Sequence, residues 1–115
     1  MKSDVLKAKS IEVRETIEQE ILTGRLQAGA RMYSSNEIME KFGLGKTTAL
    51  KILKQMEESN ITYKKMGKGY YIKPFAVEVL SDKYKEKLIK DVDALLSFAE
   101  AINLREFLLD YIGGE

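Results

Sequence analysis

Residues 34–73 carry the pattern that most constrains this chain: two short amphipathic segments joined by glycines and followed by a hairpin. Ser34, with a glutamate three residues later, has the spacing of a capping box and predicts the start of a first helix. That helix should end at Phe42, because the segment 43–45, Gly-Leu-Gly, favours a tight turn. A second helix is expected over 46–59, with Ala49, Ile52 or Leu53, and Met56 on its inward face. Asn60 should end it, because asparagine tolerates the left-handed conformation. Two helices joined by so short a glycine turn are typical of a helix-turn-helix.

A β-hairpin is predicted directly after the second helix. Two runs of β-favouring residues, 61–65 and 70–73, are separated by the segment 66–69, Met-Gly-Lys-Gly, and two glycines in so short a segment favour a hairpin turn. Pro74, the only proline, ends the second run. A helix-turn-helix followed by a hairpin forms a winged helix.

Helical segments are expected on both sides of this motif. Residues 1–9 are polar and rich in lysine, and we expect them to form a mobile arm. Ser10 can cap a helix that ends at Gly24, since glycine readily adopts the left-handed conformation. In the tail, apolar residues recur every three or four positions from Val77 to Ile112.

The expected architecture is mostly α with a small β-hairpin wing, in two parts. Residues 1–76 form a winged-helix domain, and residues 77–115 form a helical tail. Asn103 and Glu106 have the spacing of a second capping box, which would open a last short helix.

The composition excludes several classes of chemistry. The 115 residues include neither cysteine nor histidine, which removes disulfides, thiolate nucleophiles, Cys/His zinc sites and histidine bases. No apolar run approaches the roughly 18 residues of a membrane helix. The first residues lead into no apolar signal segment, so a cytoplasmic protein is expected. We predict no catalytic residue, no cofactor and no metal site, and therefore no enzyme.

The charge is unevenly distributed along the chain. The net charge is only +1, yet residues 31–74 carry nine bases and four acids, whereas residues 75–115 carry five bases and nine acids. A basic middle segment beside an acidic tail indicates that the middle meets a polyanion. The alternative is a solvated surface on which charges cluster by chance.

Short stretches within residues 10–74 have the order and spacing of a known family. They are Gly24 and Leu26, Gly29-Ala30-Arg31-Met32, Ser34, Ile38 through Phe42-Gly43-Leu44, Lys46-Thr47-Thr48, Leu53 and Met56, and Gly67-Lys68-Gly69. Together they resemble the N-terminal DNA-binding domain of GntR-family transcriptional regulators. The short tail is similar to that of the YtrA-like subgroup, and the resemblance implies a tail that mainly dimerises the protein.

The family usually has DNA-contacting arginines at three positions that here hold Asn36, Lys46 and Leu50. Lys46 keeps the positive charge but lacks the planar guanidinium fork. Asn36 can form two hydrogen bonds with adenine, and Leu50 can touch a thymine methyl group. Tyr33 stands where the family usually has proline, and Gly45 replaces a capping serine. The resemblance therefore implies DNA binding as a class, but these departures mean that it does not carry over the family's usual operator sequence.

A recognition helix enters the major groove by its N-terminal end, where free backbone N–H groups also favour a phosphate. Outward lysines further along can reach phosphates, and a glycine at the wing tip lets the backbone approach the minor groove. The predicted DNA-binding residues are Ser34, Asn36, Lys46, Thr47, Thr48, Leu50, Lys51, Gly67 and Lys68. The alternative for each of these residues is a purely structural role. The lysines would be exposed to solvent, the threonines would cap the helix, and the glycine would be required by its turn.

The apolar stripe of the tail predicts a two-fold dimer, because a palindromic operator needs two readers about one DNA turn apart. The candidate dimerisation residues are Leu80, Tyr84, Leu88, Val92, Leu95 and Ala99. The alternative is that the stripe packs against the winged-helix domain of its own chain.

The sequence thus predicts a dimeric, sequence-specific DNA-binding transcriptional regulator, most simply a repressor that occludes a promoter. Its partners would be double-stranded operator DNA and a second copy of the chain. A small-molecule effector is compatible with this function, although no pocket can be read from the sequence. The alternative is a winged-helix protein-interaction module without specific DNA binding, which the outward Leu50 and the net charge near zero favour.

Overall fold

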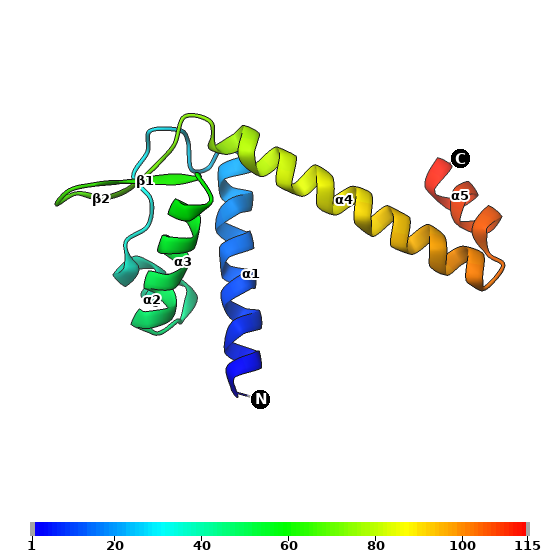
Figure 1. Cartoon of the computed structure of the whole chain (residues 1–115), viewed down its shortest axis with the longest axis horizontal. Coiled ribbons are helices and arrows are strands. Elements are labelled where there is room, and N and C mark those ends of the chain that lie inside the picture. The colour runs from blue at the N-terminus through cyan, green and yellow to red at the C-terminus, as the bar shows by residue number, and fades with distance from the viewer. Residues whose placement is uncertain (1, 115) are drawn as a thin grey trace. The chain divides into compact units, whose positions relative to one another are not determined.

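The chain folds into two compact units, Met1–Ser81 and Asp82–Glu115. The computed structural model describes residues 2–114, with side chains from residue 4 onward. The elements, in chain order, are α1 (Lys2–Leu22), α2 (Ser35–Phe42), α3 (Lys46–Glu58), β1 (Thr62–Lys65), β2 (Gly69–Ile72), α4 (Ala76–Ala101) and α5 (Arg105–Gly113). Figure 1 shows α2 and α3 packed beside α1, with the hairpin projecting from the end of α3. This order confirms the predicted winged helix-turn-helix followed by a helical segment.

Helix α1 begins at Lys2, so the mobile arm expected over residues 1–9 is wrong from residue 2 onward. Residues 2–9 contain no glycine or proline, and the lysines, leucine and alanine among them favour a helix. Ser10 is therefore an interior helical residue and not the cap. The helix ends as predicted, because Gly24 adopts a left-handed φ of 84°.

The helix-turn-helix forms where the sequence predicts it. The capping box of α2 is confirmed: the Ser34 side chain accepts a hydrogen bond from the backbone N–H of Glu37, whose carboxylate accepts one from the backbone N–H of Ser34. Gly43 ends α2 in the left-handed conformation, with φ 68°. Asn60 follows α3 with a φ of 64°, which few residues other than glycine and asparagine tolerate.

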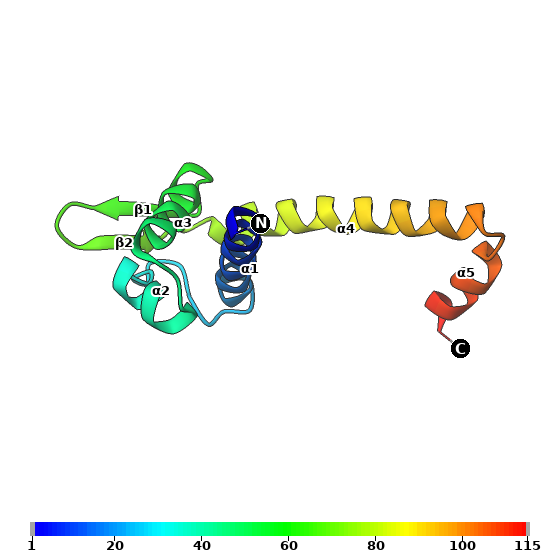
Figure 2. The same ribbon diagram turned by 90° about the horizontal axis from the view of Figure 1, so that it is seen from below.

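The wing is a two-stranded antiparallel hairpin in which Thr62 pairs with Ile72 and Lys65 with Gly69 (Figure 2). The segment 29–32 lies along the other edge of β2. The N–H of Gly29 donates to the carbonyl of Ile72 over 2.9 Å, and the N–H of Met32 donates to the carbonyl of Tyr70 over 2.8 Å. The hairpin is therefore anchored along its β2 edge by backbone hydrogen bonds.

The core of the first unit lies where α1, α2, α3 and the hairpin meet. The inward face of α3 is the predicted one, and all four of its apolar residues are buried: Ala49, Ile52, Leu53 and Met56. The other elements contribute fully buried side chains to the same unit, including Ile17, Ile21, Met32, Ile38, Ile61, Ile72 and Leu80.

The second unit contains the later part of α4 together with α5. The division falls after Ser81, later than the expected boundary at residue 76, because Ala76 and Leu80 are buried in the first unit. The capping box expected at Asn103 does not form. Asn103 instead adopts a left-handed φ of 59° in the turn, and the cap of α5 is Leu104, which provides no side-chain hydrogen bond.

Replacing Ile52 with alanine should lower the free energy of unfolding by about 2–5 kcal/mol. The side chain is fully buried, and its removal leaves a cavity in addition to the lost transfer energy. Leu50 is the matched control, since it lies on the same helix with 47% of its surface exposed. Leu50→Ala should cost about 1 kcal/mol or less. Urea unfolding followed by circular dichroism measures both, and equal losses would contradict the assigned faces of α3.

Candidate nucleic-acid interface

The N-terminal end of α3 is open to an anion. Lys46 and Thr47 are exposed there, and Thr48 is half-buried. The cap is Gly45, which has no side chain, and across the described residues no side-chain hydrogen bond closes this end. Backbone N–H groups of a first helical turn lack intrahelical partners, and the helix dipole adds partial positive charge. Such an end favours a phosphate oxygen.

The outward face of α3 is cationic as far as Lys54, with Leu50 as an apolar interruption, and the exposed Glu58 follows one turn later. Lys46, Lys51 and Lys54 are exposed on it. Leu50 is also exposed, although leucine more often lies inside a protein. Because the opposite face of the helix forms the core, these four side chains share the solvent side. This face can offer phosphate contacts from its lysines and an apolar contact from Leu50.

The predicted site residues of α2 have different surroundings. The Oγ of Ser34 accepts a hydrogen bond from the N–H of Glu37 over 3.1 Å, so this side chain is engaged in capping. Arg31 is engaged as well, since its guanidinium donates to the carboxylate of Glu37 over 2.9 Å. Asn36 is exposed on the first turn of α2. Because Ser34 and Arg31 already make contacts within the chain, the exposed amide of Asn36 is the side-chain group of this region that is best placed to contact a base.

The capping contacts also change the acidity of Glu37. The hydrogen bond from the backbone N–H of Ser34 lowers the pKa of this carboxyl below its ordinary value of 4.5, and burial opposes that effect. The Ser34 hydroxyl and the charge of Arg31 lower the pKa further. The start of α2 is therefore most stable with Glu37 ionised.

Gly67 and Lys68 lie in the exposed turn of the wing, as predicted. The N–H of Lys68 donates to the carbonyl of Lys65 over 2.9 Å and closes the turn. Gly67 has a φ of 75°, and a Cβ placed on it would meet nothing within 4 Å. The turn therefore requires glycine for its backbone conformation, and the open space around it leaves room for a close approach by DNA.

The wing also presents side chains that the sequence pattern does not single out. Lys65 Nζ lies 4.3 Å from the ring centroid of Tyr71, and Lys64 Nζ lies 5.8 Å from that of Tyr70. Met66 at the tip has 97% of its surface exposed. Lys64 lies directly opposite Tyr70, whereas Lys65 reaches Tyr71 diagonally. The alternation of lysines and tyrosines along the two strands was the available signal, because opposite and diagonal neighbours in an antiparallel pair share one face.

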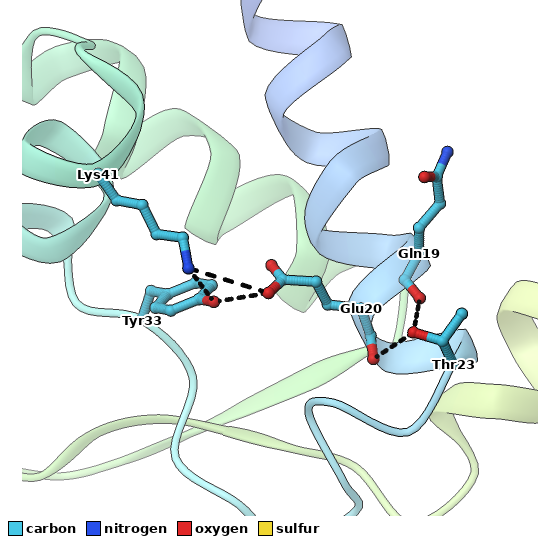
Figure 3. A network of polar contacts seen from close by, with 5 residues as sticks. All are labelled: Gln19, Glu20, Thr23, Tyr33 and Lys41. Carbon is cyan, nitrogen blue, oxygen red and sulfur yellow. Dashed lines mark hydrogen bonds and ion pairs between the residues drawn. The ribbon is translucent and has the colours of Figure 1, made fainter.

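A polar network positions the segment that leads into α2 (Figure 3). The hydroxyl of Tyr33 donates to Glu20 Oε2 of α1 over 2.9 Å and accepts from Lys41 Nζ of α2 over 3.0 Å. Lys41 Nζ also lies 4.0 Å from Glu20 Oε2. The hydrogen bond to Tyr33 raises the pKa of Lys41, and Glu20 acts in the same direction. Tyr33, at the usual proline position of the family resembled, thus ties α2 to α1.

The candidate dimerisation residues fall into two groups. Leu88, Val92 and Leu95 are exposed, and Tyr84 is half-buried. Leu80 is fully buried in the core of the first unit, and Ala99 is buried as well. Neither of these two side chains has surface to offer a partner, so the interface role expected for them does not fit their burial.

No group of three or more acidic, histidine or cysteine side chains among the described residues is placed to hold a metal ion. No helix among them is long and apolar enough to cross a bilayer.

Solved structures of transcriptional regulators share this fold. A GntR family transcriptional regulator from Listeria monocytogenes is 22% identical, with 92% of this chain and 93% of that chain covered and a TM-score of 0.77. A transcriptional regulator from Oenococcus oeni is 18% identical, with 91% and 90% covered and a TM-score of 0.72. AraR(DBD), solved in complex with operator ORR3, is 25% identical, with 56% and 77% covered and a TM-score of 0.52. No protein-family model and no curated protein matches the sequence.

Acid should remove the stabilising contribution of Glu37. Its pKa is lowered in the folded chain, so the contribution is fully present above pH 4.5 and is lost as the pH falls through the folded pKa. Glu37→Gln should therefore be less stable than the wild type at pH 7, and the difference should shrink as the pH falls below 4.5. Urea unfolding at a series of pH values measures this. Glu40→Gln, an exposed position on the same helix, is the control, and an equal effect there would contradict the assignment.

Proposed function

We propose that this chain is a sequence-specific DNA-binding transcriptional regulator of the GntR family, and not an enzyme. The observation that carries the proposal is the uncapped, lysine-bearing N-terminal end of α3, exposed on a winged helix. Lys46 and the first-turn N–H groups would contact phosphate or a base edge, and Leu50 would contact a thymine methyl group. The fold shared with AraR(DBD), which was solved with its operator, supports DNA as the partner.

We further propose that the protein acts as a dimer through the second unit, as in the YtrA-like subgroup. Large apolar side chains are exposed along this unit, which soluble monomers rarely tolerate over a wide patch. They are Leu88, Ile89, Val92, Leu95 and Phe98 of α4, Ile102 and Leu104 of the turn, and Phe107, Leu109, Tyr111 and Ile112 of α5. A second copy would cover this surface and present two heads to a palindromic operator, and a bound dimer would repress by occluding a promoter.

A protein-interaction module is the second candidate function. The exposed Leu50 and Met66 favour it, because both are apolar side chains on the surface that would face DNA. Selection of bound sequences from random duplex DNA separates the two functions. A half-site that recurs with two-fold symmetry supports the regulator, whereas the absence of any enriched sequence supports the interaction module.

Lys46→Ala should weaken operator binding by about 1–3 kcal/mol if Lys46 reads a base. If it contacts phosphate alone, the loss should be similar on operator and random DNA, and the salt slope should fall by about one. Fluorescence anisotropy titrations at several salt concentrations measure both quantities. Lys85→Ala removes a matched exposed lysine from α4 and should leave binding unchanged. Unchanged affinity of Lys46→Ala on both DNAs would remove Lys46 from the interface.

A chain shortened to end after Ser81 should be monomeric and should bind the full operator about 10²–10⁴-fold more weakly. Two tethered heads make the second contact intramolecular, and the shortened chain loses that gain. The cut belongs after Ser81 because Leu80 is part of the core. Sedimentation and a binding titration measure the outcome.

Fusing an unrelated dimerising helix after Ser81 is the control for this truncation. It should restore part of the lost affinity, provided that the heads keep a spacing near one DNA turn. If the shortened chain remains a dimer, or binds as tightly as the intact chain, the second unit does not serve dimerisation.

A further inference from the structure

The N-terminal half of α1 lies beside the recognition helix and forms one wall of a surface groove. The opposite wall of this groove belongs to α3, and the groove has a volume of about 530 Å³. Lys7 and Arg14 line it from α1, and Thr48, Lys51 and Gln55 line it from α3. Figure 1 shows the two helices running side by side over this stretch. Lys7 lines this groove because α1 is helical from Lys2 onward, whereas a mobile arm over residues 1–9 would leave only the later residues of this wall in place.

The charged side chains that line this groove are all cations: Lys7, Arg14 and Lys51. Arg14 is held at the inner end, where its Nη1 donates to Gln55 Oε1 over 3.2 Å and its Nε lies 3.9 Å from the carboxylate of the buried Glu18. Glu18 offsets the charge of Arg14. The net positive charge of the groove therefore comes from Lys7 and Lys51, one from each wall.

The groove on the other side of α1 has a different character. It lies between α1 and α2, and its lining includes the carboxylate of Glu12 together with Lys9 and Lys41. Lys9 Nζ also donates to the carbonyl of Gly43 over 3.4 Å. Of these two grooves along α1, only the one beside α3 is lined by cations without a carboxylate. An anion is therefore favoured more strongly on the α3 side of α1 than on the α2 side.

The cationic groove is continuous with the proposed DNA surface. Thr48 and Lys51 line the groove and also belong to the N-terminal half of α3. A duplex held against the exposed face of α3 would bring its sugar-phosphate backbone past the mouth of the groove. The contacts of such a backbone are mostly made by lysine, arginine and hydroxyl side chains.

We propose that this groove holds a phosphate of the DNA backbone, with Lys7 and Lys51 as its cationic ligands and the Thr48 hydroxyl beside them. The N-terminal half of α1 is then a second DNA-contacting element, which sets how the recognition helix lies on the duplex. This inference rests on the proposed function, because it needs a duplex bound to α3.

Lys7→Ala in the full chain tests the proposal. Affinity falls as the salt concentration rises, so the slope of log affinity against log salt is negative. Loss of one phosphate contact should make this slope shallower by about 0.9. The ratio of wild-type to variant affinity should then shrink about 3.5-fold between 50 mM and 200 mM salt. The loss should be equal on operator and random DNA, because phosphate contacts carry no sequence information. Lys7→Glu should weaken binding further, since it places a carboxylate in the groove.

Lys9→Ala is the matched control, because it removes a lysine from the same helix but from the opposite groove. Alanine has the highest helix propensity, so neither change should unfold α1, and far-UV circular dichroism checks this. The proposal requires a reduced salt slope for Lys7→Ala and an unchanged slope for Lys9→Ala. Equal reductions would mean a general effect of charge and would overturn it.

The wild-type titration separates this inference from the proposed function. If the wild type binds duplex DNA and Lys46→Ala weakens it while Lys7→Ala leaves affinity and slope unchanged, the groove proposal is wrong and the regulator remains. If the wild type binds no duplex DNA at any salt concentration, both proposals are wrong.

Discussion

Burial of one face of α3 is the constraint on which the rest of the first unit depends. Ala49, Ile52 and Met56 have no exposed surface and meet side chains of the neighbouring elements. The helical repeat then places Leu50, Lys51 and Lys54 on the solvent side. The helix that completes the core is thus the same helix that presents Lys46 and Leu50. Any partner of this face meets side chains whose positions are set by the core.

Polar contacts around α3 fix the elements that frame this face. The capping box at Ser34 and the network at Tyr33 join the start of α2 to its own last turn and to α1. The segment 29–32 pairs with β2 and anchors the hairpin. These hydrogen bonds specify geometry more than they add stability, since a single one contributes only about 1 kcal/mol. A surface that reads DNA depends on such geometry, because base contacts need side chains held in register.

Much of the first unit could be predicted because its signals are local. A capping box, a glycine turn and the left-handed Asn60 each act within a few residues, and the structure has all three. The inward face of α3 follows from spacing alone. The same reasoning failed at Ser10 and Asn103, two residues that can cap a helix. A serine or asparagine caps a helix only where its own backbone is not helical. Where the helix begins depends on the residues before it and on tertiary packing, and the spacing of capping residues does not specify this.

The sequence by itself determined the element types, the helix-turn-helix, the wing and the surplus of lysine in residues 31–74, because these follow from composition and short-range spacing. The tertiary structure alone decided which distant side chains meet. It placed Lys7 in one groove with Lys51, joined Tyr33 to Glu20, and buried Leu80 in the first unit. These pairings follow from how the elements pack against one another. Periodicity within each element fixes its own faces and leaves its neighbours unspecified.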